Sequence, residues 1–213
     1  MYRIYLAGPD VFTRDPLAIA AAKKEVCLKY GFTGLFPLDN QLELADLSPF
    51  EQGLLISAAN EKLMRSCDLM IANMTPFRGP NTDSGTAYEM GFMRALGKPV
   101  FAYANIYTSA DGRSGREHID RVMTYYGHIQ ERTDGTFEDP ARTMLVENFG
   151  MVDNLMLDGA VYASGSEVVV SPVREADRYT DLGGFEECVR QAAVLLNGAP
   201  QNPITDELAP HSV

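Results

Sequence analysis

The alternation of short apolar segments with helical segments constrains the fold of this chain more than any other feature of its sequence. Apolar segments at residues 1–7, 32–38 and 67–74 are separated by stretches of helical spacing at 15–30 and 48–64. The third apolar segment is almost wholly apolar, as expected of a parallel strand that is covered on both faces. Such a β-α-β-α-β order predicts an α/β protein with a doubly wound parallel sheet and right-handed crossovers.

The loops that follow the predicted strands indicate where a ligand would bind. Parallel sheets of this kind bind ligands at the carboxyl ends of their strands. Three turn-rich loops, at residues 8–10, 39–41 and 75–84, follow the three predicted strands. We therefore expect these loops to meet at one end of the sheet and to form the binding site there.

The rest of the chain continues the pattern and then departs from it. A helix is expected at 85–96, a strand at 100–104, a polar insertion at 105–150 with one helix at 117–126, and a final helix at 185–196. At 213 residues, one domain is the simplest interpretation. We assign this domain to residues 1–196, place the insertion over the ligand-binding end, and interpret 197–213 as a loosely held tail.

Charge and cysteine usage exclude several classes of function. The net charge of -11 leaves no cluster of Lys and Arg for a polymeric nucleic acid, so a nucleic-acid-like ligand should be small. Cys27, Cys67 and Cys188 are odd in number and lack C-x-x-C spacing, which indicates neither a disulfide framework nor a metal site. Apolar runs stay shorter than the roughly 18 residues of a membrane span, so we expect no membrane partner and a cytoplasmic location.

Two carboxylates stand out in the loop and helix at residues 75–92, which read T-P-F-R-G-P-N-T-D-S-G-T-A-Y-E-M-G-F. Asp83 and Glu89 lie at a junction between strand, loop and helix, where paired carboxyl groups suit acid-base or nucleophilic chemistry. A structural interpretation also exists, because Thr86-x-x-Glu89 matches a capping box and Asp83 or Ser84 could cap the same turn. Spacing alone favours capping.

Five short motifs, taken together and in their order along the chain, indicate more about function than the two carboxylates alone. They are Y-L-A-G-P at 5–9, P-L-D-N-Q at 37–41, an Asp at 68 before an apolar strand, D-S-G-T-A-Y-E-M-G at 83–91, and D-N-L-M at 153–156. With them the chain resembles the nucleoside 2-deoxyribosyltransferases over most of residues 1–160. The resemblance implies a flavodoxin-like fold, with the 105–150 insertion near the active-site end, and a double-displacement reaction without metal or organic cofactor. It also favours a catalytic Glu89 over a capping one.

The resemblance implies three catalytic roles. Glu89 matches the nucleophile that attacks C1' of a 2'-deoxynucleoside and holds the sugar as a glycosyl ester, with net retention as in retaining glycosidases. A helix N-terminus would stabilise its ionised form. Tyr5 matches the tyrosine that orients this Glu, and Asp83 matches the carboxyl group that gives a proton to the departing base and takes one from the incoming base.

The resemblance also implies contacts with the substrate. Gly8 lies in the first loop, and Gln41 matches a base-contacting Gln. Asn60 stands where some members have an Asp beside the deoxyribose hydroxyls, so the chain departs from that pattern. Asn154 matches the residue that reaches a neighbouring subunit's site to hold the 5'-hydroxyl. The implied partners are small deoxynucleosides, free nucleobases and further copies of the chain, in a homo-oligomer with shared sites.

Two other functions remain open at this point. A nucleoside or deoxynucleoside 5'-phosphate N-glycosidase would use the same Glu89 with water as the acceptor. A non-catalytic nucleotide-sensing module could use the same scaffold, because a fold does not determine a function. Gly8-Pro9-Asp10 does not match the dinucleotide fingerprint G-x-G-x-x-G, and the histidines lack metal-ligand spacing.

Overall fold

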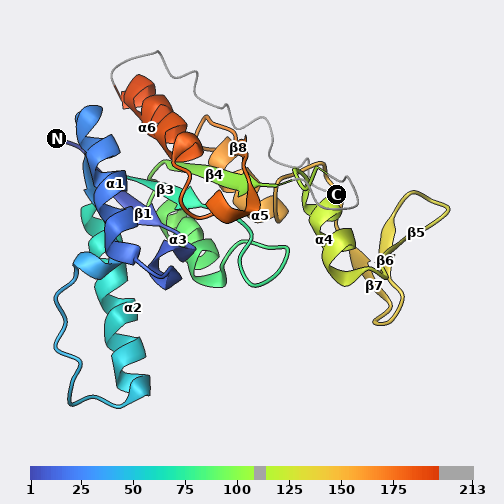
Figure 1. Ribbon diagram of the computed structural model, residues 1–213, viewed down its shortest axis with the longest axis horizontal. Coiled ribbons are helices and arrows are strands. Elements are labelled where there is room, and N and C mark those ends of the chain that lie inside the picture. The colour runs from blue at the N-terminus through green and yellow to red at the C-terminus, as the bar shows by residue number, and fades with distance from the viewer. Residues whose placement is uncertain (108–113, 197–213) are drawn as a thin grey trace, which may run out of the picture.

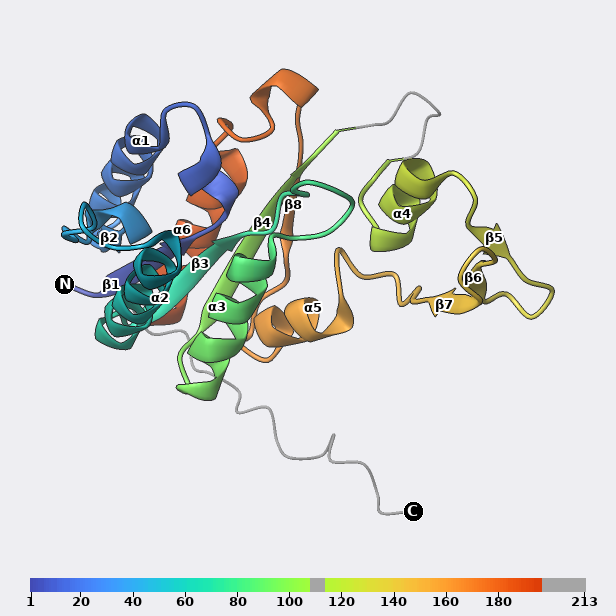
Figure 2. The ribbon, with the colours of Figure 1, turned by 90° about the horizontal axis from the view of Figure 1, so that it is seen from below.

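A central parallel sheet organises the computed structural model, which describes residues 1–107 and 114–196. Its strands are β1 (Arg3–Ala7), β2 (Thr33–Leu35), β3 (Leu69–Asn73), β4 (Val100–Ile106) and β8 (Val169–Pro172). They lie in the order β2-β1-β3-β4-β8, and each neighbouring pair is parallel (Figures 1 and 2). The predicted α/β fold with a doubly wound sheet is confirmed.

Helices cover both faces of the sheet (Figure 2). One face packs against α1 (Pro16–Lys29) and α6 (Gly183–Leu196), and the other against α2 (Pro49–Ser66), α3 (Ser84–Ala95) and α5 (Leu155–Tyr162). Alternate residues of β1 enter the two cores, because successive strand side chains point to opposite faces. Ile4 joins the core with α1 and α6, and Tyr5 joins the core with α2 and α3.

The first two helices begin where capping chemistry predicts. Asp15 accepts a hydrogen bond from the Ala18 amide at 3.1 Å, and Pro16 takes the first helical position of α1. Ser48 and Glu51 form a capping box at the start of α2. None of the helices within residues 1–107 and 114–196 combines the length and the apolar character that crossing a bilayer requires.

The structure differs from the sequence prediction mainly between residues 105 and 172. β4 continues to Ile106, two residues into the predicted insertion, and the fifth strand β8 was not predicted. The predicted helix is present as α4 (His118–Tyr126). The polar stretch after it also forms a small antiparallel sheet that was missed, with strands β5 (Gln130–Glu131), β6 (Phe137–Asp139) and β7 (Met144–Val146). Strands of two or three residues are too short to show an alternating pattern.

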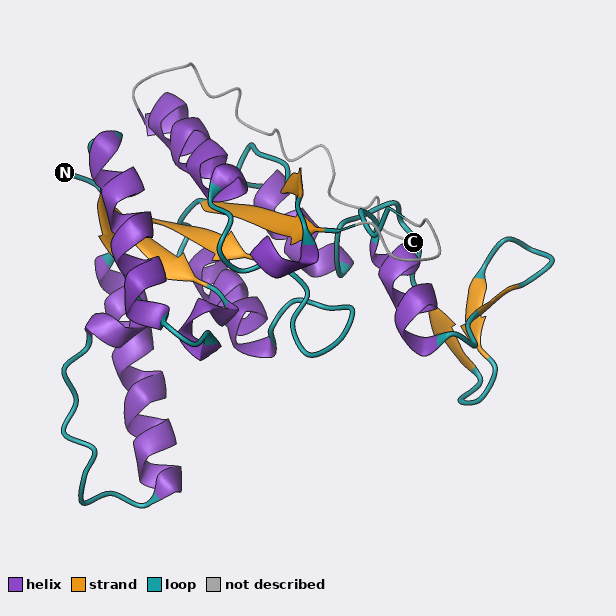
Figure 3. Cartoon of the chain, viewed as in Figure 1, coloured by secondary structure: helices purple, strands orange, loops and turns teal. Residues whose placement is uncertain are grey.

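The segment that contains α4 and these three strands extends away from the central sheet, as Figures 1 and 3 show. Within residues 1–107 and 114–196, the hydrogen bonds between this segment and the loop after β3 come from its base, at α4 and the residues before α5. The predicted insertion is therefore an arm beside the loop rather than a cover. The predicted tail at 197–213 lies outside the described residues.

Candidate active site

The candidate site lies at the carboxyl ends of β1 and β3. The sheet order reverses at this pair, because β2 lies on one side of β1 and β3 lies on the other. Such a reversal is the usual place for a ligand crevice in an open α/β sheet. β1 leads into the loop at Gly8, and β3 leads into the loop at 75–83 that delivers Asp83 to the start of α3.

Tyr5 and Glu89 are joined directly, although 84 residues separate them in the sequence. The Tyr5 hydroxyl donates a hydrogen bond to Glu89 Oε1 at 2.5 Å. Tyr5 is fully buried in β1, and Glu89 is partly buried in the second turn of α3. A short hydrogen bond from a fixed donor holds the carboxyl group in one orientation.

Ionisation of the Glu89 carboxyl is set mainly by burial. Burial raises its pKa to about 7, the hydrogen bond from Tyr5 opposes this rise, and the negative charge of Asp83 adds to it. The expectation that a helix N-terminus keeps Glu89 ionised is wrong, because the dipole effect fades beyond the first turn and Glu89 lies in the second. Burial and the charge of Glu89 raise the pKa of Tyr5, which therefore stays a phenol and a donor.

Asp83 is the N-cap residue of α3. Its Oδ2 accepts hydrogen bonds from the Thr86 amide at 3.0 Å and from the Thr86 hydroxyl at 3.2 Å. The capping interpretation is therefore confirmed for Asp83 and wrong for the Thr86-x-x-Glu89 pair, because Thr86 lies inside the helix and Glu89 bonds to Tyr5. Capping fixes Asp83 at the same end of the sheet as Glu89.

Gly8 occupies a position that only glycine fits. Its φ is +151°, a backbone conformation that side chains rarely allow. A Cβ at this position would lie 2.5 Å from Asp10 Oδ2 and 2.6 Å from Asn73 Cβ. The loop after β1 thus packs directly on the end of β3.

A buried ion pair beneath this loop was not anticipated. Lys23 Nζ lies 2.7 Å from Asp10 Oδ2, and both side chains are 1% exposed. The Asn73 side-chain amide also donates to Asp10 Oδ1 at 3.2 Å. A signal was present in the sequence, because Ala20, Lys23 and Cys27 share one face of α1 and all three are buried. A lysine on that face calls for a buried partner.

The predicted contacts on the second loop are only partly assembled. Asn60 is partly buried on α2 and accepts a hydrogen bond from the Asn40 side-chain amide at 3.3 Å. Gln41, which follows Asn40 in the chain, is exposed. The Tyr88 hydroxyl donates a hydrogen bond to the Glu61 carboxylate at 2.6 Å. Tyr88 precedes Glu89 on α3, and Glu61 follows Asn60 on α2. This part of α2 therefore lies against α3.

Asn154 caps α5 in its own chain. Its Oδ1 accepts from the Met156 amide at 3.0 Å, and its Nδ2 donates to Glu147 Oε1 at 2.9 Å. Among the described residues, no hydrogen bond joins Asn154 to Tyr5, Asp83 or Glu89. The fold of one chain thus gives Asn154 a structural role, and the predicted contact with a neighbouring subunit stays a prediction.

The sequence profile described as nucleoside 2-deoxyribosyltransferase matches residues 4–156 of the chain. The chain belongs to this family. The matched range contains every predicted site residue, from Tyr5 to Asn154, together with the arm. The family is one of transferases that act on small nucleosides.

Comparison with single proteins agrees with membership in the deoxyribosyltransferase family. An uncharacterized protein of Schizosaccharomyces pombe is 33% identical over 203 residues, which are 91% of this chain and 90% of that protein. A 2-desoxiribosyltransferase from Leishmania mexicana, whose structure is solved, is 28% identical in sequence and superposes with a TM-score of 0.57. The matched region covers 89% of this chain and 98% of that protein's chain. A conserved protein from Enterococcus faecalis is 22% identical with a TM-score of 0.50, over 90% and 99% of the two chains, and shares the fold.

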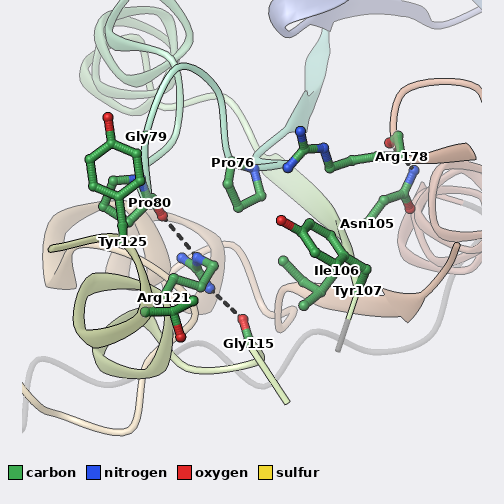
Figure 4. Close-up of a pocket in the computed structure, with 11 residues that line it drawn as sticks. Pro76, Gly79, Pro80, Asn105, Ile106, Tyr107, Gly115, Arg121, Tyr125 and Arg178 are labelled. Atoms are coloured by element: carbon green, nitrogen blue, oxygen red, sulfur yellow. Dashed lines mark hydrogen bonds between the residues drawn. The ribbon is translucent and has the colours of Figure 1, made fainter. Parts of the chain in front are cut away.

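In this deoxyribosyltransferase-family chain, the loop at 75–83 also borders a cavity, shown in Figure 4. The cavity measures about 110 Å³ and lies between the loop and the end of β4. Its lining includes Pro76, Pro80, Asn105, Arg121 and Arg178, but none of the predicted site residues. Within the described ranges, no three His, Cys, Asp or Glu side chains form a group that could hold a metal ion.

Proposed function

We propose that this protein exchanges the base of 2'-deoxynucleosides by double displacement through a glycosyl ester on Glu89. The hydrogen bond of 2.5 Å between the Tyr5 hydroxyl and Glu89 Oε1 is the observation that carries the proposal. A buried carboxyl group with a strongly shifted pKa and a dedicated donor, at the ligand-binding end of an α/β sheet, is typical of a catalytic group. Membership in the family supports the same chemistry.

In the first half-reaction, ionised Glu89 attacks C1' of the deoxyribose. The bond between C1' and the base nitrogen breaks, and its electron pair leaves with the base. Asp83, in its protonated form, supplies a proton to that base. Tyr5 holds Oε1 of Glu89, so that the other carboxylate oxygen is free to form the ester bond.

In the second half-reaction, a nitrogen of the incoming base attacks C1' and Glu89 leaves as a carboxylate. Asp83 takes the proton that the incoming base loses and returns to its starting form. Two inversions at C1' give net retention. With water as the acceptor, the same steps hydrolyse the nucleoside, so the acceptor decides between the transferase and the N-glycosidase.

Four residues are proposed to hold the substrate: Gly8 in the first loop, Gln41 at the base, Asn60 near the deoxyribose, and Asn154 at the 5'-hydroxyl of a neighbouring subunit's substrate. We also retain a homo-oligomer and a cytoplasmic location as parts of the proposal. Because the pocket is expected to approach C2' closely, 2'-deoxynucleosides should react far faster than ribonucleosides.

The test is product analysis with deoxyinosine or thymidine, in the presence and absence of free adenine. Adenine-dependent formation of deoxyadenosine supports the transferase, and release of free base alone indicates a hydrolase. Glu89→Ala should lower turnover by about a thousandfold or more, since it removes the attacking group. The control is Glu25→Ala, which changes an exposed glutamate on α1 and should leave turnover unchanged.

A covalent label identifies the nucleophile itself. A 2'-fluoro-arabino nucleoside slows breakdown of the ester, so mass spectrometry of a digest should find the sugar on Glu89. Wild-type turnover in folded Glu89→Ala, or a label on another residue, would contradict the assignment.

A further inference from the structure

The arm contacts the loop at 75–83, called here the catalytic loop because it delivers Asp83, through one buried arginine. Arg121 lies on α4, and its side chain is 9% exposed. Its guanidinium donates to the carbonyl oxygens of Pro80 (2.8 Å), Gly115 (2.9 Å), Arg116 (3.2 Å) and Val152, and contacts the Asp153 carboxylate (3.4 Å). The bonds to Pro80 and Gly115 are drawn in Figure 4. One side chain thus joins the loop after β3 to both ends of the arm.

The next two residues of the loop are held by the same cluster. Asp153 Oδ2, which is buried, accepts from the Thr82 amide at 2.8 Å and from the Thr82 hydroxyl at 3.0 Å. Asn81 Nδ2 lies 3.0 Å from His118 Nε2. An amide nitrogen can only donate, so this ring nitrogen accepts, which requires neutral His118. Burial lowers the pKa of His118 and so favours the neutral form.

These contacts fall on three consecutive residues, Pro80, Asn81 and Thr82, directly before Asp83. Asp83 in turn caps α3, the helix that carries Glu89. A shift of the loop would therefore move Asp83 relative to the bond between Tyr5 and Glu89. Acid catalysis is sensitive to such shifts, because the proton donor must lie within hydrogen-bond reach of the leaving group.

We propose that Arg121 and Asp153 are positioning residues, which hold Asp83 where it can transfer a proton to the leaving base. The inference rests on the proposed function and gives the arm a role in it. Neither residue touches the reacting atoms in this assignment. Because each neutralises the other in a buried place, loss of one leaves an unpaired charge beside the loop.

Two substrates that differ in whether the leaving base needs a proton distinguish a misplaced Asp83 from a general loss of folding. The base of 2'-deoxyguanosine needs a proton as it leaves. The base of 7-methyl-2'-deoxyguanosine already carries a positive charge and leaves as a neutral molecule. Arg121→Met should lower kcat on 2'-deoxyguanosine by about 10- to 100-fold and on the methylated substrate by less than about threefold. Asp83→Asn should show the same selectivity.

Combination and control variants sharpen this test. The double variant Arg121→Met with Asp83→Asn should be no slower than Asp83→Asn alone, because both changes remove one function. Arg121→Lys should recover only part of the rate, since an ammonium group cannot bond to the same set of acceptors. Arg142→Met changes an exposed arginine of the same arm, which pairs with Asp139, and should leave kcat on both substrates unchanged.

If Arg121→Met fails to fold, Thr82→Val replaces it. Valine keeps the shape of the threonine and leaves the amide bond to Asp153 in place. It removes the hydroxyl, which bonds to Asp153 at 3.0 Å and to the Met74 carbonyl at 3.4 Å, so the same selectivity is expected with a smaller loss. Equal losses on both substrates, or no loss on either, would overturn the proposal for whichever variant folds.

Hydrogen exchange separates this proposal from the proposed function. The Thr82 amide, bonded to Asp153, should exchange about tenfold or more faster in Arg121→Met, while amides of α6 keep their wild-type rates. Unchanged exchange at Thr82 would overturn the positioning role even if the enzyme is active. A wild-type protein with neither transferase nor hydrolase activity would instead refute the proposed function.

Discussion

At the scale of single residues, the Glu89 carboxyl lies between two neighbours with opposite effects on its ionisation. The Tyr5 hydroxyl lowers its pKa, and the Asp83 charge raises it, against a larger rise from burial. Because the attacking group must be ionised, kcat/KM should decrease as the pH falls below about 7. A pH–rate profile with the acid limb near the ordinary value for a glutamate would contradict this assignment.

The two neighbours should shift that acid limb in opposite directions. Tyr5→Phe removes a hydrogen bond to the carboxylate, so the limb should move to higher pH. Asp83→Asn removes the negative charge that an ionised Asp83 places beside Glu89, so the limb should move to lower pH, apart from its effect on the maximum rate. The measurement is kcat/KM against pH for both variants. Shifts in the same direction would show that the limb belongs to another group.

The same burial predicts a cost in stability. A carboxyl whose pKa rises from 4.5 unfolded to about 7 folded binds its proton more tightly in the folded state. The fold therefore loses stability as the pH rises from 4.5 to 7, by about 3 kcal/mol in total. Glu89→Gln, which stays neutral and can still accept from Tyr5, should be more stable than wild type at pH 8 and about equal below pH 4.5. Urea unfolding at both pH values measures the difference.

At the scale of elements, the loop between β1 and α1 depends on Gly8. Gly8→Ala should destabilise the fold by about 2–4 kcal/mol, because a side chain is strained at this φ and would meet Asp10 and Asn73. Gly53→Ala is the matched control within α2, where a Cβ meets nothing within 4 Å, and should stabilise by about 0.5–1 kcal/mol. Equal effects of the two changes on the unfolding free energy would contradict this account of the loop.

At the scale of the whole molecule, the arm and α2 carry apolar side chains that one chain leaves exposed. Exposed apolar residues on these two parts include Phe50, Leu54, Tyr125, Met144 and Leu145. Large exposed apolar groups are typical of surfaces that meet another protein. They agree with the proposed homo-oligomer, in which subunits related by symmetry would complete each other's sites.

Subunit mixing tests that assembly. Glu89→Ala and Asn154→Ser should each be severely impaired alone, and after subunit exchange a mixture should regain activity, because some sites then contain both native residues. Serine still caps a helix, so an active Asn154→Ser enzyme would show that Asn154 only caps α5. An active monomer in sedimentation at assay concentration would also exclude shared sites.

What the sequence by itself determined is local or periodic. Short apolar segments placed the first four strands of the sheet, turn residues marked the loops at its carboxyl end, and the motif at 83–91 indicated the carboxylates. Each of these signals lies within a few neighbouring residues. Only the tertiary structure decided what depends on distant neighbours. The contact of Tyr5 with Glu89 crosses 84 residues, and the raised pKa of Glu89 follows from desolvation by the whole core. Likewise, Arg121 is bound to the catalytic loop only because carbonyl groups from separate segments converge on it in the fold, and no spacing in the sequence records that convergence.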